Sequence, residues 1–153
     1  MNTANGVTLI ELMVTIAVLA ILAAIAIPSF TDLADSRRLV NATEAIYNDL
    51  QYVRSEAAKR TRQLTAKVEG DCLIIVGQSG SLPSTCMATY PGVALSVTGF
   101  PVTFDRVRGM PNPPLGGTIT LTSASGRIAK VIVSKFGRVR ICSPSNAGGY
   151  PSC

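Results

Sequence analysis

Residues Val7–Ile27 read VTLIELMVTIAVLAILAAIAI, and this apolar run dictates how the whole chain is organised. Within these 21 residues only Thr8, Glu11 and Thr15 are polar. A helix of this length is about 31 Å long at 1.5 Å per residue, which matches the hydrocarbon thickness of a lipid bilayer. We therefore expect a membrane-spanning helix over residues 7–28, with the working part of the protein outside the bilayer.

The residues after Pro28 continue the helical pattern in an amphipathic form. Mostly apolar positions recur at spacings of four, three, four, three and four, which places them on one stripe of a helix. The stripe consists of Leu39, Thr43, Ile46, Leu50, Val53 and Ala57. We expect this helix to continue to about Arg62 and to lay the stripe on a sheet. We expect Pro28 to kink or locally melt the helix.

The remaining sequence is typical of short antiparallel strands. Apolar and β-branched runs alternate with reversals at Gly70-Asp71, Ser125-Gly126 and Phe136-Gly137. The expected strands are Leu64–Val68, Cys72–Val76, Val93–Val97, Val102–Phe104, Ile119–Thr122, Ile128–Val133 and Arg138–Cys142. The predicted fold class is therefore α+β, with one long N-terminal helix packed on antiparallel sheet.

Four cysteines lie in the part expected outside the cytoplasm, and they predict two disulfides. Three connectivities are possible. We favour Cys72–Cys86 and Cys142–Cys153 because both close short loops. A zinc site is the alternative, but the sequence contains no CxxC pair and no histidine. We expect no metal and no cofactor.

The composition argues against an enzyme. Because the chain has no histidine, it lacks the usual general base and the usual Ser-His-Asp or Cys-His nucleophile systems. Gly116-Gly117 is not followed by the Lys-Ser/Thr of a phosphate-binding loop. We therefore expect a binding or structural protein.

The charge is distributed unevenly along the chain. Up to Asp105 there are seven basic and nine acidic residues, whereas the segment after Asp105 has seven basic residues and no acidic one. Such a one-sided positive field favours a polyanion as partner. The alternative is a solvated surface whose charge only maintains solubility. The seven bases are Arg106, Arg108, Arg127, Lys130, Lys135, Arg138 and Arg140.

The heptapeptide Gly6-Val7-Thr8-Leu9-Ile10-Glu11-Leu12 resembles the processing site of type IV pilins and type II secretion pseudopilins. The resemblance implies that a prepilin peptidase removes leader 1–6, cutting between Gly6 and Val7, and that Val7 is then N-methylated. It also implies that Glu11 compensates the terminal ammonium of a neighbouring subunit during filament assembly. Two departures are Val7 in place of the usual Phe and a leader without Lys or Arg.

Later segments resemble the FimT/GspH group of minor pilins, namely Leu50–Arg60, Gly117–Thr122, Gly126-Arg127 and Val131–Cys142. The resemblance implies a leader at 1–6, a membrane-spanning and filament-core helix at 7–28, an amphipathic helix at 29–62 and a β-rich head at 63–153. Within the head, Gly137-Arg138-Val139-Arg140 matches the GRxR motif of FimT-type pilins that bind DNA during natural transformation.

On a strand, Arg138 and Arg140 project from one face while Val139 points to the core. Lys135 precedes them across the Gly137 reversal. The DNA-binding residues we expect are Arg138, Arg140, Lys135, Gly137, Lys130 and Arg127. They would contact phosphates without reading bases, and the scarcity of stacking aromatics favours duplex DNA over single strands.

The resemblance thus implies a minor pilin anchored by a single span in the inner membrane, with a periplasmic head, and later built into an extracellular type IV pilus. Its expected partners are DNA, other pilins, the prepilin peptidase and the inner membrane. The alternative is a structural or priming minor pilin, or a type II secretion pseudopilin. In that case Gly137 serves a hairpin, and the arginines are charges that deter edge-strand pairing.

Overall fold

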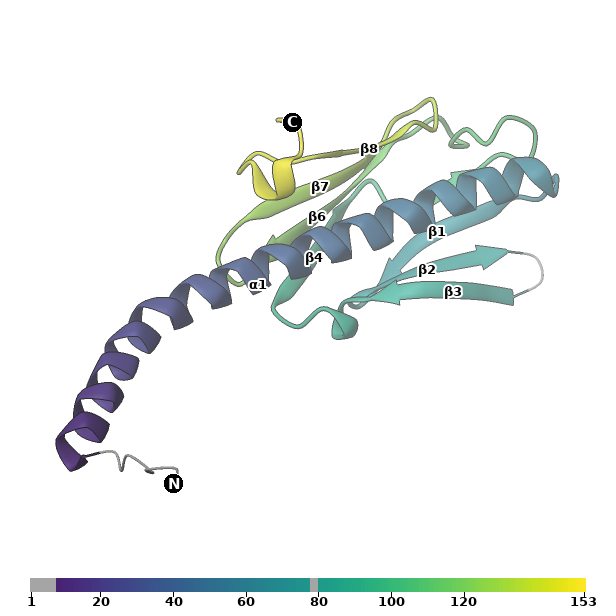
Figure 1. Ribbon diagram of the computed structural model, residues 1–153. Coiled ribbons are helices and arrows are strands. Elements are labelled where there is room, and N and C mark those ends of the chain that lie inside the picture. The colour runs from purple at the N-terminus through teal and green to yellow at the C-terminus, as the bar shows by residue number, and fades with distance from the viewer. Residues whose placement is uncertain (1–7, 78–79) are drawn as a thin grey trace, which may run out of the picture. The chain divides into compact units, whose positions relative to one another are not determined.

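The computed structural model describes residues 8–77 and 80–153, so leader 1–6 and the expected cleavage site between Gly6 and Val7 lie outside the described residues. The chain divides into two compact units, Met1–Ala34 and Asp35–Cys153. A single helix, α1 (Leu9–Lys59), contributes residues to both units (Figure 1).

The first unit is the apolar half of α1. Thr8 precedes the helix as its N-cap, because its Oγ1 accepts the backbone N–H of Glu11 at 3.3 Å and so satisfies one of the free donors at the helix start. Its large side chains are exposed, with Leu9 at 77% and Phe30 at 72%. In the described part of the chain, α1 is the helix long and apolar enough to cross a membrane.

The helix continues through Pro28 without interruption, so the expected local melting is not observed. A proline removes one backbone N–H donor. The remaining backbone hydrogen bonds of this long helix are sufficient to keep it helical at Pro28.

The second unit begins with the amphipathic half of α1, and here the predicted stripe is confirmed. All six of its side chains are completely buried: Leu39, Thr43, Ile46, Leu50, Val53 and Ala57. The polar member of the stripe is satisfied within its own helix, because the Thr43 hydroxyl donates to the Leu39 carbonyl at 2.7 Å. The stripe is therefore the helical side of the core.

The helix ends at Lys59, three residues before the expected end at Arg62. Thr61 has a left-handed backbone with φ of 51°, and the Arg62 N–H donates to the Ala57 carbonyl at 3.2 Å. This bond pattern is that of a Schellman C-cap, which a left-handed residue closes. No glycine marks the position, so the sequence contains no signal for this stop.

The strands form two four-stranded antiparallel sheets. The first has the order β3-β2-β1-β5, with β1 (Leu64–Glu69), β2 (Cys72–Gly77), β3 (Gly80–Cys86) and β5 (Val102–Phe104). The second has the order β4-β6-β7-β8, with β4 (Val93–Thr98), β6 (Gly117–Ser123), β7 (Ile128–Val133) and β8 (Val139–Cys142). Short 3₁₀ turns occur at Met87–Thr89 and Ala147–Gly149.

The long helix on antiparallel strands confirms the predicted fold class, with two corrections among the strands. Strand β3 is not among the expected strands; it contains Pro83 and lies at a sheet edge, where a missing N–H is tolerated. The expected last strand began at Arg138, whereas β8 begins at Val139 because Arg138 still belongs to the preceding turn.

The core lies between the buried stripe of α1 and the inner faces of both sheets (Figure 1). In β6, Ile119 and Leu121 are buried while Thr118, Thr120 and Thr122 are only half-buried. This alternation, with a period of two, shows which face of the second sheet is directed toward the core.

Both favoured disulfides are present. Cys72 and Cys86 are directly paired across β2 and β3, with Cα atoms 4.0 Å apart. Cys142 at the end of β8 is bonded to Cys153, the last residue, with Cα atoms 5.0 Å apart. The second bridge returns the C-terminal segment to the sheet, where the Ser143 hydroxyl donates to the Ile128 carbonyl at 2.6 Å.

Candidate nucleic-acid interface

The GRxR segment begins in the tight turn between β7 and β8. The Gly137 N–H donates to the Ser134 carbonyl at 2.8 Å, and the Ser134 N–H donates to the Arg138 carbonyl at 2.9 Å. The Ser134 hydroxyl oxygen also accepts the Arg138 N–H at 3.0 Å. With φ of 77° at Gly137, this is a three-residue hairpin loop closed by a glycine bulge. We call residues 134–138 the arginine hairpin.

Gly137 is required for a second reason, a close approach of two backbones. A Cβ at Gly137 would lie 2.6 Å from the Gly109 carbonyl oxygen and 3.3 Å from the Met110 Cα. The hairpin therefore packs directly on residues 109–111, far from it in sequence. Gly137 thus acts through the backbone, and its presence is explained without DNA.

The two arginines of the motif are exposed, and Val139 between them is buried. Arg140 pairs with Ile132 across the β7–β8 ladder, while Lys130 pairs with Cys142. Lys130 and Arg140 are therefore diagonal neighbours on the outer face of the sheet, with a typical separation of about 7–8 Å.

The basic side chains at this end form no ion pair with an acidic residue in the part of the chain that the structure describes. Within residues 8–77 and 80–153, no ion pair involves Lys130, Lys135, Arg138 or Arg140. Lys135 instead places its Nζ 5.2 Å from the ring centroid of the exposed Phe136, at cation–π distance. These cations are thus available to an external anion.

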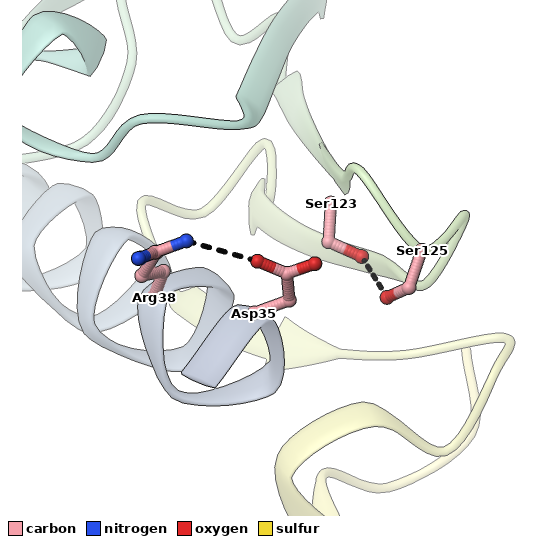
Figure 2. A network of polar contacts seen from close by, with 4 residues as sticks. All are labelled: Asp35, Arg38, Ser123 and Ser125. Carbon is pink, nitrogen blue, oxygen red and sulfur yellow. Dashed lines mark hydrogen bonds and ion pairs between the residues drawn. The ribbon is translucent and has the colours of Figure 1, made fainter. Parts of the chain in front are cut away.

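Arg127 lies away from this group. It follows Gly126 in the β6–β7 turn, where its N–H donates to the Ser123 hydroxyl oxygen at 3.1 Å. Figure 2 shows this turn, with the Ser123–Ser125 hydroxyl bond and the Arg38–Asp35 ion pair of α1. The six residues of β7, at about 3.3 Å each, separate Arg127 from the arginine hairpin by about 20 Å. Of the six expected residues, Lys135, Gly137 and Arg138 lie in the hairpin, Arg140 follows on β8 with Lys130 as its diagonal neighbour in the middle of β7, and Arg127 lies at the opposite end of β7.

Two cavities lie near the loops of this end. One of about 360 Å³ is lined mainly by the 99–103 and 112–116 loops, including Phe100, Pro101 and Leu115. The other, of about 300 Å³, is lined by polar residues alone: Thr61, Arg62, Gln63, Asp105, Arg106 and Asn112. Among the described residues, no three His, Cys, Asp or Glu side chains are grouped so as to hold a metal ion.

Asp49 and Tyr150, whose pKa values are raised, lie elsewhere and attach other elements to α1. Burial raises the pKa of the Asp49 carboxyl, although the Thr85 hydroxyl donates to it at 2.6 Å. Burial and the nearby Glu44 carboxylate raise the pKa of Tyr150 to about 12. The Tyr150 hydroxyl donates to Glu44 at 3.4 Å, which joins the C-terminal segment to the helix.

Comparison with known proteins gives two family matches. Residues 1–27 match the prokaryotic N-terminal methylation motif, and residues 42–137 match the family described as type II transport protein GspH. The second match ends at Gly137, immediately before the two arginines of the motif.

Individual relatives include the pilin-like protein PilA1 of Thermus thermophilus. Its alignment with this chain is 163 positions long, is 27% identical, and covers 91% of this chain and 99% of the relative. The type IV minor pilin FimU of Pseudomonas aeruginosa is similar in structure, with a TM-score of 0.59, 25% identity and coverage of 74% of this chain and 95% of FimU. The minor pseudopilin EpsH of the Vibrio cholerae type 2 secretion system shares the fold, with a TM-score of 0.56, 13% identity and coverage of 70% and 98%.

Proposed function

Because the chain belongs to the family of the type II transport protein GspH and carries the N-terminal methylation motif of pilin-like proteins, we propose that it is a minor pilin of a type IV pilus that binds extracellular DNA. Pilins and pseudopilins are structural proteins, and the chain is a minor pilin or pseudopilin. Membership of that family does not imply DNA binding or a role in natural transformation, and these two properties are what we propose.

The observation that carries the proposal is a group of solvent-accessible cations on and beside the arginine hairpin, none of which is ion-paired with any of the residues that the structure describes. Arg138 and Arg140 would hold phosphate oxygens with planar guanidinium forks, and Lys130 and Lys135 would add point charges. None of them reads a base edge in this role, so binding would be independent of sequence. If four phosphates are neutralised, log K falls by about 3.6 per decade of salt concentration.

In this proposal the N-terminal segment serves processing, membrane anchoring and filament assembly. A prepilin peptidase would cut between Gly6 and Val7 and methylate Val7, and Glu11 would then compensate that ammonium in the neighbouring subunit. Before assembly, the apolar half of α1 would cross the inner membrane once and hold the head in the periplasm, where both disulfides are stable. After assembly with other pilins, retraction of the pilus would draw bound DNA inward.

The second candidate is a priming minor pilin or a type II secretion pseudopilin that does not bind DNA. The fold shared with EpsH and the purely structural explanation of Gly137 favour it. It predicts no salt-sensitive DNA binding and a requirement for protein export.

The test measures binding of a short duplex to the full chain in non-ionic detergent, oxidised, across a salt series. The wild type is compared with Arg138→Gln/Arg140→Gln and with the charge-matched control Arg37→Gln/Lys67→Gln. Arg37 is exposed at the start of the second unit, and Lys67 is paired with Glu69 in the first sheet. Steep salt dependence that is lost only in the hairpin variant supports DNA binding, whereas no binding by the wild type at low salt favours the second candidate.

A further inference from the structure

The loop that follows β5 packs between α1 and the arginine hairpin. Gly109 is buried at this junction, and a Cβ there would lie 3.0 Å from the Arg54 carbonyl oxygen of α1. On its other side, the Gly109 carbonyl oxygen is the atom that a Cβ at Gly137 would meet at 2.6 Å. The loop is therefore held by the helix and by the hairpin together.

The same loop is ordered by its own backbone bonds. The Asp105 N–H donates to the Met110 carbonyl at 2.7 Å, and the Gly109 N–H donates to the Asp105 carbonyl at 3.0 Å. These bonds close a turn in which Arg106, Val107 and Arg108 are exposed while Gly109 is buried. Two arginines are thus presented to solvent on a fixed turn.

The contact of the two glycines limits how far apart the arginines beside them can be. Arg108 precedes Gly109 and Arg138 follows Gly137, so standard backbone bond lengths place their Cα atoms at most about 14 Å apart. The major groove of B-DNA is about 12 Å wide, which is within the reach of two such side chains. One duplex can therefore contact the loop and the hairpin simultaneously.

The surroundings add to the positive field. Arg106 lines the 300 Å³ polar cavity together with Arg62, which follows the end of α1. The acids here are Glu56, which is paired with Arg60, and Asp105, whose carboxylate accepts the Arg108 N–H at 3.4 Å. The three segments 54–62, 105–111 and 134–138 hold these two acids and eight bases: Arg54, Lys59, Arg60, Arg62, Arg106, Arg108, Lys135 and Arg138.

We propose that Arg106 and Arg108 form a second arm of the DNA-binding surface, so that phosphates of one duplex bridge the 105–111 loop and the arginine hairpin. This inference rests on the proposed function. Neither arginine has an ion-pair partner among the residues that the structure describes. Arginine is also the side chain best suited to hold phosphate oxygens in a fixed geometry.

The test uses the full oxidised chain in non-ionic detergent, short duplex DNA and a salt series. We expect Arg106→Gln/Arg108→Gln to weaken binding of every sequence alike and to reduce the salt slope of log K by about 2, one unit for each lost phosphate contact. Arg37→Gln/Lys67→Gln removes the same charge elsewhere; along α1, Arg37 is about 26 Å from Arg54. This control is expected to keep the wild-type slope. Thermal unfolding verifies that all variants remain folded.

The outcomes separate the inference from the proposed function. If only the hairpin variant loses affinity while Arg106→Gln/Arg108→Gln behaves as the control does, the second arm is wrong and the proposed function stands. If the control loses as much as the loop variant, net charge explains the effect and the second arm is again wrong. If the wild type binds no DNA at low salt, both fail. A photo-crosslinking residue in place of Val107 should capture bound DNA, whereas one in place of the exposed Asn41 on α1 should not.

Discussion

Gly109 and Gly137 are in backbone contact: a Cβ on Gly137 would lie 2.6 Å from the carbonyl oxygen of Gly109. Both residues also have a positive φ, 59° for Gly109 and 77° for Gly137. The pair joins a loop and a hairpin that lie far apart in the chain and carry most of the exposed arginines of this end. The position of each basic segment therefore depends on the other.

This contact makes Gly137→Ala a sensitive test of the packing. The substitution forces a side chain into a left-handed backbone, which costs about 1–2 kcal/mol, and the clash with Gly109 adds to that cost. We expect the total loss of unfolding free energy to be about 2–4 kcal/mol, measured by denaturant titration.

Gly126→Ala is the matched control. Gly126 occupies the same place in the β6–β7 turn with φ of 78°, but a Cβ there would have nothing within 4 Å. It should show the backbone cost alone, about 1–2 kcal/mol. Equal losses in both variants would mean that the Gly109–Gly137 contact does not constrain the hairpin.

The C-cap of α1 offers a stabilising substitution. Thr61 is a β-branched residue with φ of 51°, a conformation that glycine adopts freely. We expect Thr61→Gly to raise the unfolding free energy by about 1 kcal/mol, and Thr61→Asn to give a smaller gain because asparagine tolerates this region. Chemical denaturation measures both. A loss of stability in Thr61→Gly would contradict the assigned cap.

Asp49 predicts a pH-dependent difference. Because burial raises the pKa of Asp49, the folded state binds the proton of this carboxyl more tightly than the unfolded state does. The contribution of Asp49 to the unfolding free energy therefore falls as pH rises from its unfolded-state pKa to its folded-state pKa. Asp49→Asn removes the charge and keeps an acceptor for the Thr85 hydroxyl. We expect the variant to be the more stable protein at neutral pH, with the difference vanishing in acid.

Thermal unfolding at several pH values measures this difference. The control Thr85→Val removes the hydroxyl that donates to Asp49 at 2.6 Å and leaves the carboxylate with one partner fewer. It should destabilise the protein more as pH rises and Asp49 becomes ionised. A constant difference between the wild type and Asp49→Asn at all pH values would refute the raised pKa.

Tyr150 predicts an alkaline transition. Burial and the Glu44 carboxylate raise the pKa of Tyr150 to about 12, so the folded state favours the neutral phenol. Its contribution is complete below the ordinary value of 10.0 and is lost as pH rises through about 12. Phenolate absorbance should show a titration phase of Tyr150 near pH 12.

Tyr150→Phe should remove that late phase, whereas Tyr52→Phe, on the exposed side of α1, should retain it. Persistence of the late phase in Tyr150→Phe would mean that the C-terminal segment is not held on Glu44.

The sequence by itself determined the elements whose signal is periodic or chemical. The stripe from Leu39 to Ala57 is buried because helical spacing puts its members on one face, and Ile119 and Leu121 are buried because strands alternate. Cys72–Cys86 and Cys142–Cys153 followed from the short loops they close. These features depend on spacing along the chain, which is two residues in a strand, three or four in a helix, and 14 and 11 residues between the bonded cysteines.

Tertiary structure decided what depends on contacts between distant residues. The helix ends at Lys59 because Thr61 adopts a left-handed backbone, and no glycine in the sequence predicts this end. Strand β3 contains Pro83 and forms nevertheless, at the edge of its sheet. The separation of Arg127 from the arginine hairpin follows from the direction of β7. Arg108 lies near Arg138 because Gly109 and Gly137 let two backbones touch, and spacing in the chain cannot encode a contact between surfaces that meet only after the sheets and helix have packed.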